Sequence, residues 1–220
     1  MADNGNVCMQ EVRFRFIGRI IAGFTHELKN HLAIIKESAG LQQDLLSMSR
    51  KPDSAELNKF LRSVDSQVAR GLQLISFLNR FAHRMDYECS LFSVNEAIEE
   101  LAALMSRHAY QKGIEFIKDL DSGISSIDGN PSVLQLLVFL IVEGLMDSFE
   151  KGGAITLGTR SARDKISISI IPKGTMKESS EKKDYRVEAI NEACRVLLAT
   201  VERHGETGES VIILSRSDVN

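Results

Sequence analysis

The 220-residue sequence has no tryptophan and only three prolines, so it contains few helix breakers and its first part can form long helices. It also has only three cysteines, Cys8, Cys89 and Cys194, without paired spacing. An odd number of unpaired cysteines is typical of reduced thiols and argues against a disulfide framework, so we expect a cytoplasmic protein. No Cys/His cluster in the sequence has metal-ligand spacing, and we expect no metal site.

Long apolar runs and an excess of basic charge are missing as well. The longest apolar run, residues 136–142, is far shorter than the ~20 residues that span a bilayer. The first ten residues lack a basic start followed by an apolar stretch, so we expect no signal peptide. The formal net charge of −3 argues against nucleic acid, because phosphate backbones are usually met by a basic surface. We therefore expect neither a membrane nor a nucleic acid as partner.

The first part of the sequence indicates two long helices. Residues 12–48 carry apolar side chains spaced three and four apart, and Asp53 with Glu56 resembles a capping box for a second helix. Between 57 and 85 the apolar steps alternate between four and three, which is a heptad seam. A single antiparallel hairpin does not bury the apolar faces of both helices, so we expect a homodimer with a four-helix bundle. Phe14, Phe16, Phe77 and Phe81 are expected in the bundle core.

The rest of the sequence has the pattern of an α+β fold. Three segments are expected: a tail at 1–11, the helical hairpin at 12–88 and a second domain at 89–220. The Asn130-Pro131 pair is typical of a helix cap and a first-turn proline. The expected helices are 93–111, 130–150 and 185–203, the expected strands are 114–119, 154–160, 165–171 and 210–215, and 172–184 is expected to be a polar loop. The helices are expected to pack on one face of the sheet.

His26 stands out on the first helix. On a helical wheel, Ile17, Phe24, Leu28 and Ile35 fall within roughly 20° of the direction opposite His26, so the imidazole is expected to face outward. Gly23 lowers helix propensity by about 1 kcal/mol relative to alanine, which suggests a use for the space beside it. The other residues on or next to this face are Arg19, Ala22, Asn30, Ala33 and Glu37.

Such a site suits a phosphoryl acceptor, which needs an exposed, neutral imidazole on a rigid element. A histidine with an ordinary pKa is largely neutral near pH 7. The adjacent Glu27 can fix the tautomer of the ring or accept its proton. By geometry alone, however, an exposed histidine is more often a solvated surface residue.

Residues 24–32, Phe-Thr-His-Glu-Leu-Lys-Asn-His-Leu, resemble the H-box of bacterial sensor histidine kinases. In that family the phosphoacceptor histidine is followed by Glu or Asp, and a proline usually stands where this sequence has His31. Residues 92–96 resemble the linker into a kinase catalytic domain, 128–135 the approach to the N-box, and 152–155 the strand after it. The resemblance implies that His26 is the phosphoacceptor and that the second domain is a kinase-like α/β sandwich.

The departures from the kinase pattern fall on its nucleotide site. Aligned from Gln135, the two N-box asparagines are replaced by Phe139 and Glu143, and Pro172 stands where an aspartate reads adenine. No glycine-rich lid follows, since residues 175–184 contain no glycine. ATP phosphates need backbone amides and a metal ligand, so these departures imply a degenerate site without bound cofactor. The alternative is a misaligned N-box in which Glu143 holds magnesium.

The whole pattern is similar to bacterial histidine phosphotransferases, which shuttle phosphate between aspartates of response-regulator receiver domains. This resemblance implies catalytic roles for His26, Glu27 and Asn30, with magnesium brought by the receiver domain. Asn30 either positions a water, as in kinases with phosphatase activity, or is simply solvated; His31 is either a second acceptor or a partly buried helix residue. The partner-docking residues are expected to be Arg19, Ala22, Gly23, Ala33 and Glu37. An ATP-dependent kinase and a non-catalytic scaffold remain the alternatives.

Overall fold

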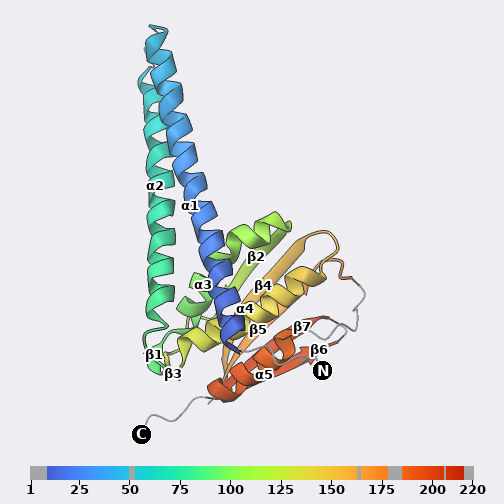
Figure 1. Ribbon diagram of the computed structural model, residues 1–220. Coiled ribbons are helices and arrows are strands. Elements are labelled where there is room, and N and C mark those ends of the chain that lie inside the picture. The colour runs from blue at the N-terminus through green and yellow to red at the C-terminus, as the bar shows by residue number, and fades with distance from the viewer. Residues whose placement is uncertain (1–8, 50–52, 163–164, 178–184, 206, 216–220) are drawn as a thin grey trace, which may run out of the picture.

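A computed structural model describes residues 9–49, 53–162, 165–177, 185–205 and 207–215. The elements in chain order are α1 Met9–Ser47, α2 Ser54–His83, β1 Ser90–Phe92, α3 Val94–Gln111, β2 Ile114–Leu120, β3 Ile127–Gly129, α4 Pro131–Ser148, β4 Gly153–Ala162, β5 Lys165–Lys173, α5 Tyr185–Leu197, β6 Ala199–His204 and β7 Glu209–Ser215 (Figure 1). Parts of three predictions lie outside the described residues: residues 1–8 of the tail, 178–184 of the polar loop and 216–220 of the second domain.

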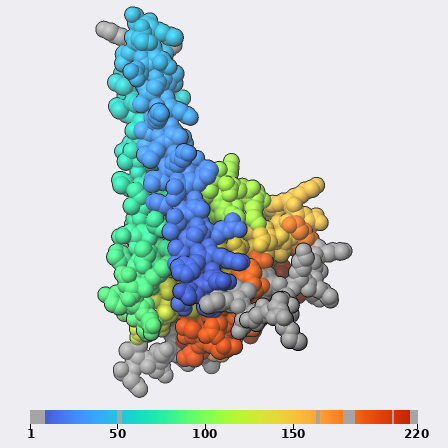
Figure 2. All heavy atoms as spheres, viewed as in Figure 1, coloured from blue at the N-terminus to red at the C-terminus, as the bar shows by residue number. Residues whose placement is uncertain are grey.

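The first two helices form the expected antiparallel hairpin, which stands as a rod beside the rest of the molecule (Figure 1). The predicted capping box is confirmed: the side chain of Asp53 accepts from the backbone N–H of Glu56, and the Glu56 side chain reaches back to the Asp53 N–H. The helices approach closely at Gly71, where an added Cβ would lie 3.5 Å from Leu28 Cδ1. The half of the hairpin near its tip stands clear of the sheet domain (Figure 2).

The second domain is a five-stranded mixed sheet with the order β2-β4-β5-β7-β6, covered by α3, α4 and α5 (Figure 1). Alternate residues of its central strands are buried, which is the pattern of a sheet packed on one face. Ile155 and Leu157 of β4 and Ile168 and Ile170 of β5 are examples. The mixed helix and sheet architecture agrees with the predicted fold class.

One predicted helix is too long. The helix expected to reach 203 ends at Leu197, and residues 199–204 form the edge strand β6, paired antiparallel with β7. Leu198 takes a left-handed backbone angle, φ 51°, which stops the helix and turns the chain. The β-branched Thr200 and Val201 then suit a strand. The short strands β1 and β3, which pair with each other, were not predicted.

Helix α4 is the core helix of the sheet domain. Asn130 caps it by accepting from the Val133 N–H, and Pro131 occupies its first turn, as predicted. Among the described residues it is the one helix long and apolar enough to cross a membrane by length and composition. Since 72% of that stretch is buried inside the protein, its apolar character is explained by core packing.

The hairpin and the sheet domain share one hydrophobic core. Phe16 of α1 is buried between Phe81 of α2, at a ring-centroid distance of 5.3 Å, and Phe139 of α4, at 4.7 Å. Phe16 and Phe81 are therefore core residues, although their core includes the second domain and is not confined to the bundle. Phe14 is 64% exposed in the single chain, so its place in a bundle core stays a prediction that depends on the dimer.

Candidate functional site

His26 is exposed on α1, beyond Ile20, the last residue of that helix in the buried set of the core. The residues predicted to lie opposite it, Ile17, Phe24, Leu28 and Ile35, are all half-buried, so the imidazole faces away from the packed side of the helix. Within the described part of the chain, the His26 ring has no hydrogen bond or ion pair. The ring is thus accessible to a partner molecule.

His31, five residues on, has a different environment. Only 12% of its side chain is exposed, and its Nδ1 donates to Gln67 Oε1 of α2 at 2.7 Å. Its Nε2 lies 4.0 Å from Glu27 Oε1 on the preceding turn. Since both ring nitrogens face groups of the hairpin itself, the geometry favours His31 as a helix–helix contact over a second acceptor. Glu27 faces His31, and no hydrogen bond joins it to His26 among the described residues.

The expected docking residues divide into two groups. Ala22, Ala33 and Glu37 are exposed. Gly23, in contrast, lies against α3, where an added Cβ would sit 3.1 Å from the Leu104 carbonyl oxygen, tighter than ordinary contact. Arg19 reaches α4 and forms an ion pair within the chain. Packing against α3 accounts for the small residue at position 23, whereas Arg19 has a side chain that is 57% exposed, so its docking role stays a prediction.

Beside Glu27 and His31 lies a groove of about 580 Å³ between the hairpin, α3 and β2. Glu27 is 30% exposed at its side chain, and Asn30 is half-buried on the next turn. The groove is bordered on the domain side by Glu99, Tyr110, Glu115 and Lys118, among others.

The two N-box positions lie on the face of α4 that packs against α1. The Phe139 ring is buried against Phe16, as described above. Glu143 is 6% exposed; its Oε1 lies 3.5 Å from Arg19 Nε of α1, and its Oε2 accepts from the Tyr185 hydroxyl of α5 at 3.2 Å. Both positions are therefore occupied by contacts within the chain.

Charged and aromatic side chains surround this contact. The guanidinium carbon of Arg15 lies 5.2 Å from the centroid of the Tyr185 ring, a cation–π arrangement. Burial, and next the charge of Glu143, raises the pKa of the Tyr185 hydroxyl, which keeps it a hydrogen-bond donor. Nearby, burial alone would raise the pKa of Asp147, but hydrogen bonds from Lys112 at 2.5 Å and Arg186 at 2.8 Å outweigh it and lower that pKa.

No protein-family model matches the chain. The signal transduction histidine-protein kinase AtoS of Escherichia coli (strain K12) is 27% identical over 151 residues, which cover 68% of this chain and 24% of that protein. The sensor protein FixL of Bradyrhizobium diazoefficiens is 25% identical over 166 residues, covering 74% of this chain and 33% of that protein. The chain thus spans about a quarter to a third of the length of these curated relatives.

Solved structures agree on the fold. The Acinetobacter baumannii histidine kinase AdeS has a TM-score of 0.50 and 13% identity, covering 89% of this chain and 98% of that chain. Full-length ShkA in complex with AMPPNP has a TM-score of 0.51 and 13% identity, covering 91% of this chain and 46% of that chain. The fold is histidine-kinase-like. The chain is homologous to sensor histidine kinases.

The N-box resemblance implies two asparagine side chains at the nucleotide site, at positions 139 and 143. Here one of the two positions is an apolar ring and the other is a carboxylate already paired with Arg19 and hydrogen-bonded by Tyr185. The residues present therefore do not fit Mg-ATP at these positions.

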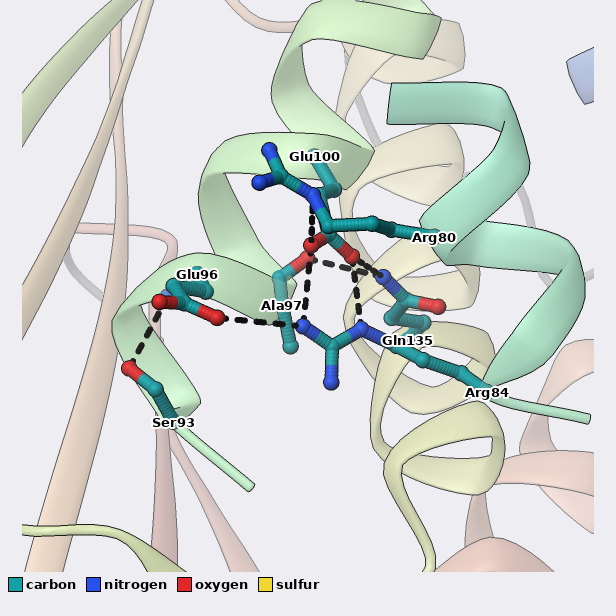
Figure 3. A network of polar contacts seen from close by, with 7 residues as sticks. All are labelled: Arg80, Arg84, Ser93, Glu96, Ala97, Glu100 and Gln135. Carbon is teal, nitrogen blue, oxygen red and sulfur yellow. Dashed lines mark hydrogen bonds and ion pairs between the residues drawn. The ribbon is translucent and has the colours of Figure 1, made fainter. Parts of the chain in front are cut away.

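The kinase-like domain is joined to the hairpin by a buried charge network that the sequence analysis missed (Figure 3). Glu100 of α3 is fully buried and accepts from Arg84 Nε at 2.6 Å and from Arg84 Nη2 at 2.9 Å. Arg80 lies 3.0 Å from the same carboxylate, and Gln135 of α4 donates to it at 3.3 Å. Arginines at 80 and 84 share one face of α2, and this spacing was the available signal, but only the fold reveals their common partner.

Proposed function

We propose that this chain is a histidine phosphotransferase of a two-component phosphorelay, with His26 as the residue that carries phosphate. The observation that supports it most directly is a contrast within one structure. His26 is exposed and unpaired among the described residues, whereas the positions of the kinase nucleotide ligands are filled by contacts of Phe139 and Glu143. Phosphate therefore reaches His26 from another protein and not from ATP bound to this domain.

The proposed reaction is an in-line phosphoryl transfer. A ring nitrogen of His26 attacks the phosphorus of a receiver-domain phospho-aspartate, the new N–P bond forms, and the aspartate carboxylate leaves with the electrons of the broken P–O bond. In the return step the carboxylate of another receiver domain attacks, and the N–P bond breaks. Glu27, the next residue along the chain, is proposed to orient the imidazole, which requires its carboxylate to turn from His31 toward His26. Asn30 lies on the next turn, where the Glu-x-x-Asn motif would place an amide beside the phosphoryl group.

The proposal includes its partners and its setting. Response-regulator receiver domains are the proposed partners and bring the magnesium, so no resident cofactor is required. The exposed seam of α2 is proposed to pair with a second copy, forming a four-helix bundle in a cytoplasmic homodimer. Arg19, Ala22, Ala33 and Glu37 are the proposed docking residues, because each is exposed on α1.

An ATP-dependent histidine kinase is the second candidate, and the homology to AtoS and FixL favours it. In that case a nucleotide would bind in an arrangement different from the one described, with the domain lifted from α1. The two candidates differ in one simple property, which is the affinity for Mg-ATP.

The test is phosphate acceptance from a ³²P-labelled, phosphorylated receiver domain. Acid-labile, alkali-stable label is expected on the wild-type chain and is expected to be lost in His26→Gln. His31→Ala is the matched control, because its ring contacts Gln67 and Glu27, and it is expected to keep the label. Label that persists in His26→Gln and disappears in His31→Ala would move the acceptor to His31. If no variant accepts label but regulator binding persists, the chain is a scaffold.

A further inference from the structure

The face of α4 that would hold a nucleotide in a kinase is covered by α1. Phe139 and Glu143 lie one helical turn apart on α4, and Phe16 and Arg19 lie about one turn apart on α1. The pairs meet in register: Phe16 contacts Phe139 with a centroid distance of 4.7 Å, and Arg19 Nε lies 3.5 Å from Glu143 Oε1. Opening this face requires α4 and α1 to separate.

Two further contact sets connect the domain to α2 and to the linker that follows it, at the same end of the hairpin. At the end of α2, Arg80 and Arg84 converge on the buried Glu100 of α3 (Figure 3). The segment that leaves α2 pairs with the domain as strand β1, in register Ser90↔Gly129 and Phe92↔Ile127 with β3. A single linker would leave the domain free to rotate, but contacts on α1, on α2 and along the linker leave no free hinge.

Undocking would also be unfavourable. It would expose Phe16, Phe81 and Phe139, which are each no more than 3% exposed, and aromatic burial is a large favourable term. It would also separate the Glu143 carboxylate from Arg19 and the Glu100 carboxylate from its two arginines. Removing one member of a buried charge pair is strongly destabilising.

We propose that the former nucleotide face, through Phe139 and Glu143, is an intrachain docking surface that holds the kinase-like domain in one fixed orientation on the hairpin. The groove beside Glu27 then keeps the same shape before and after phosphotransfer, and a partner meets a preorganised surface. This inference does not depend on the chemistry of His26, so a failed transfer assay would leave it standing.

Distances between spin labels test the orientation directly. The native cysteines are replaced, and spin labels are attached at Lys36→Cys on the exposed side of α1 and at Thr200→Cys on β6. The labelled chain is diluted into excess unlabelled chain, so that only distances within one chain are measured. One narrow distance distribution is expected for the wild-type fold, with and without a receiver domain. A broad or two-component wild-type distribution would overturn the proposal.

The role of the two residues is tested by variants. Phe139→Asn with Glu143→Asn recreates the kinase amides and is expected to add a second, broad distance population. Arg19→Ala is a milder change, because this side chain is 57% exposed, and it is expected to broaden the distribution while the fold persists. Arg13→Ala is the control, an exposed arginine of α1 without an ion pair among the described residues. If Arg19→Ala folds and keeps the narrow distribution of Arg13→Ala, these positions do not hold the domain.

Calorimetry provides a second measurement. The wild-type chain is expected to unfold in a single transition, because hairpin and domain share one core. The variant with asparagine at both 139 and 143 is expected to show two resolved transitions, because the domain and the hairpin would then unfold separately. Two transitions in the wild type would indicate an independently folding domain and would overturn the fixed orientation.

Discussion

Arg84 at the end of α2 donates two hydrogen bonds to the fully buried carboxylate of Glu100 in α3. Glu100→Ala leaves both Arg84 and Arg80 without this partner, and we expect a loss of about 3–5 kcal/mol in the free energy of unfolding, measured by urea denaturation. Glu99→Ala is the control, since Glu99 is an exposed neighbour paired with Lys118 at 3.7 Å and should lose at most about 1 kcal/mol. Equal effects of both substitutions would show that the buried network does not stabilise the junction.

Mg-ATP is expected not to bind at useful affinity. The reason is that the two N-box positions contact Phe16, Arg19 and Tyr185. Titration calorimetry should stay flat up to about millimolar nucleotide, a binding free energy weaker than about −4 kcal/mol. Micromolar binding, or labelling of His26 from radioactive ATP, would favour the kinase candidate.

The hairpin is expected to be the dimer interface. Leu61 is 51% exposed and Ile75 45% exposed in the single chain, although both belong to the heptad seam of α2. Light scattering should give twice the chain mass of 24.5 kDa for the wild type, and Leu61→Glu or Ile75→Glu should give monomer, because an unpaired charge in an interface costs several kcal/mol. Leu91→Glu, at a 68% exposed position of β1, is the control and should remain dimeric. A compact wild-type monomer would contradict the bundle.

His108 of α3 is expected to make stability depend on pH. Burial, and then the charges of Arg19 and Lys112, lower its pKa below 6.5, while Asp147 acts in the opposite direction. As pH falls from about 7.5 to 5, the unfolded chain takes up a proton that the folded chain resists, so stability decreases over that range. Asp147 does not account for a decrease in this range, because its own pKa is lowered from 3.8 and its contribution is lost only in stronger acid.

The measurement is the melting temperature of the wild type and of His108→Gln across the same pH range. The variant should show a flatter profile between about pH 7 and 5, because glutamine does not titrate there. Parallel profiles for the two proteins would show that His108 does not cause the pH dependence.

Most helices and strands followed from local pattern alone. The capping box at Asp53, the cap and proline at 130–131 and the paired strands β4 and β5 are each set by neighbouring residues, which is why sequence analysis placed them. The end of α5 was misplaced because apolar and polar residues at 197–204 suit a helix as well as a strand, and pairing with β7 decided between them.

The sequence by itself determined that His26 faces outward, since the helical period and the apolar residues around it leave no other direction. It also determined that amides are missing at 139 and 143. Only the tertiary structure decided what replaced them: the Phe16–Phe139 contact, the Arg19–Glu143 pair and the close approach of Gly23 to Leu104. These contacts join elements that are distant along the chain, and no local pattern specifies which distant side chain will lie opposite. For the same reason, the sequence alone did not reveal that Gly23 and Arg19 make contacts within the chain.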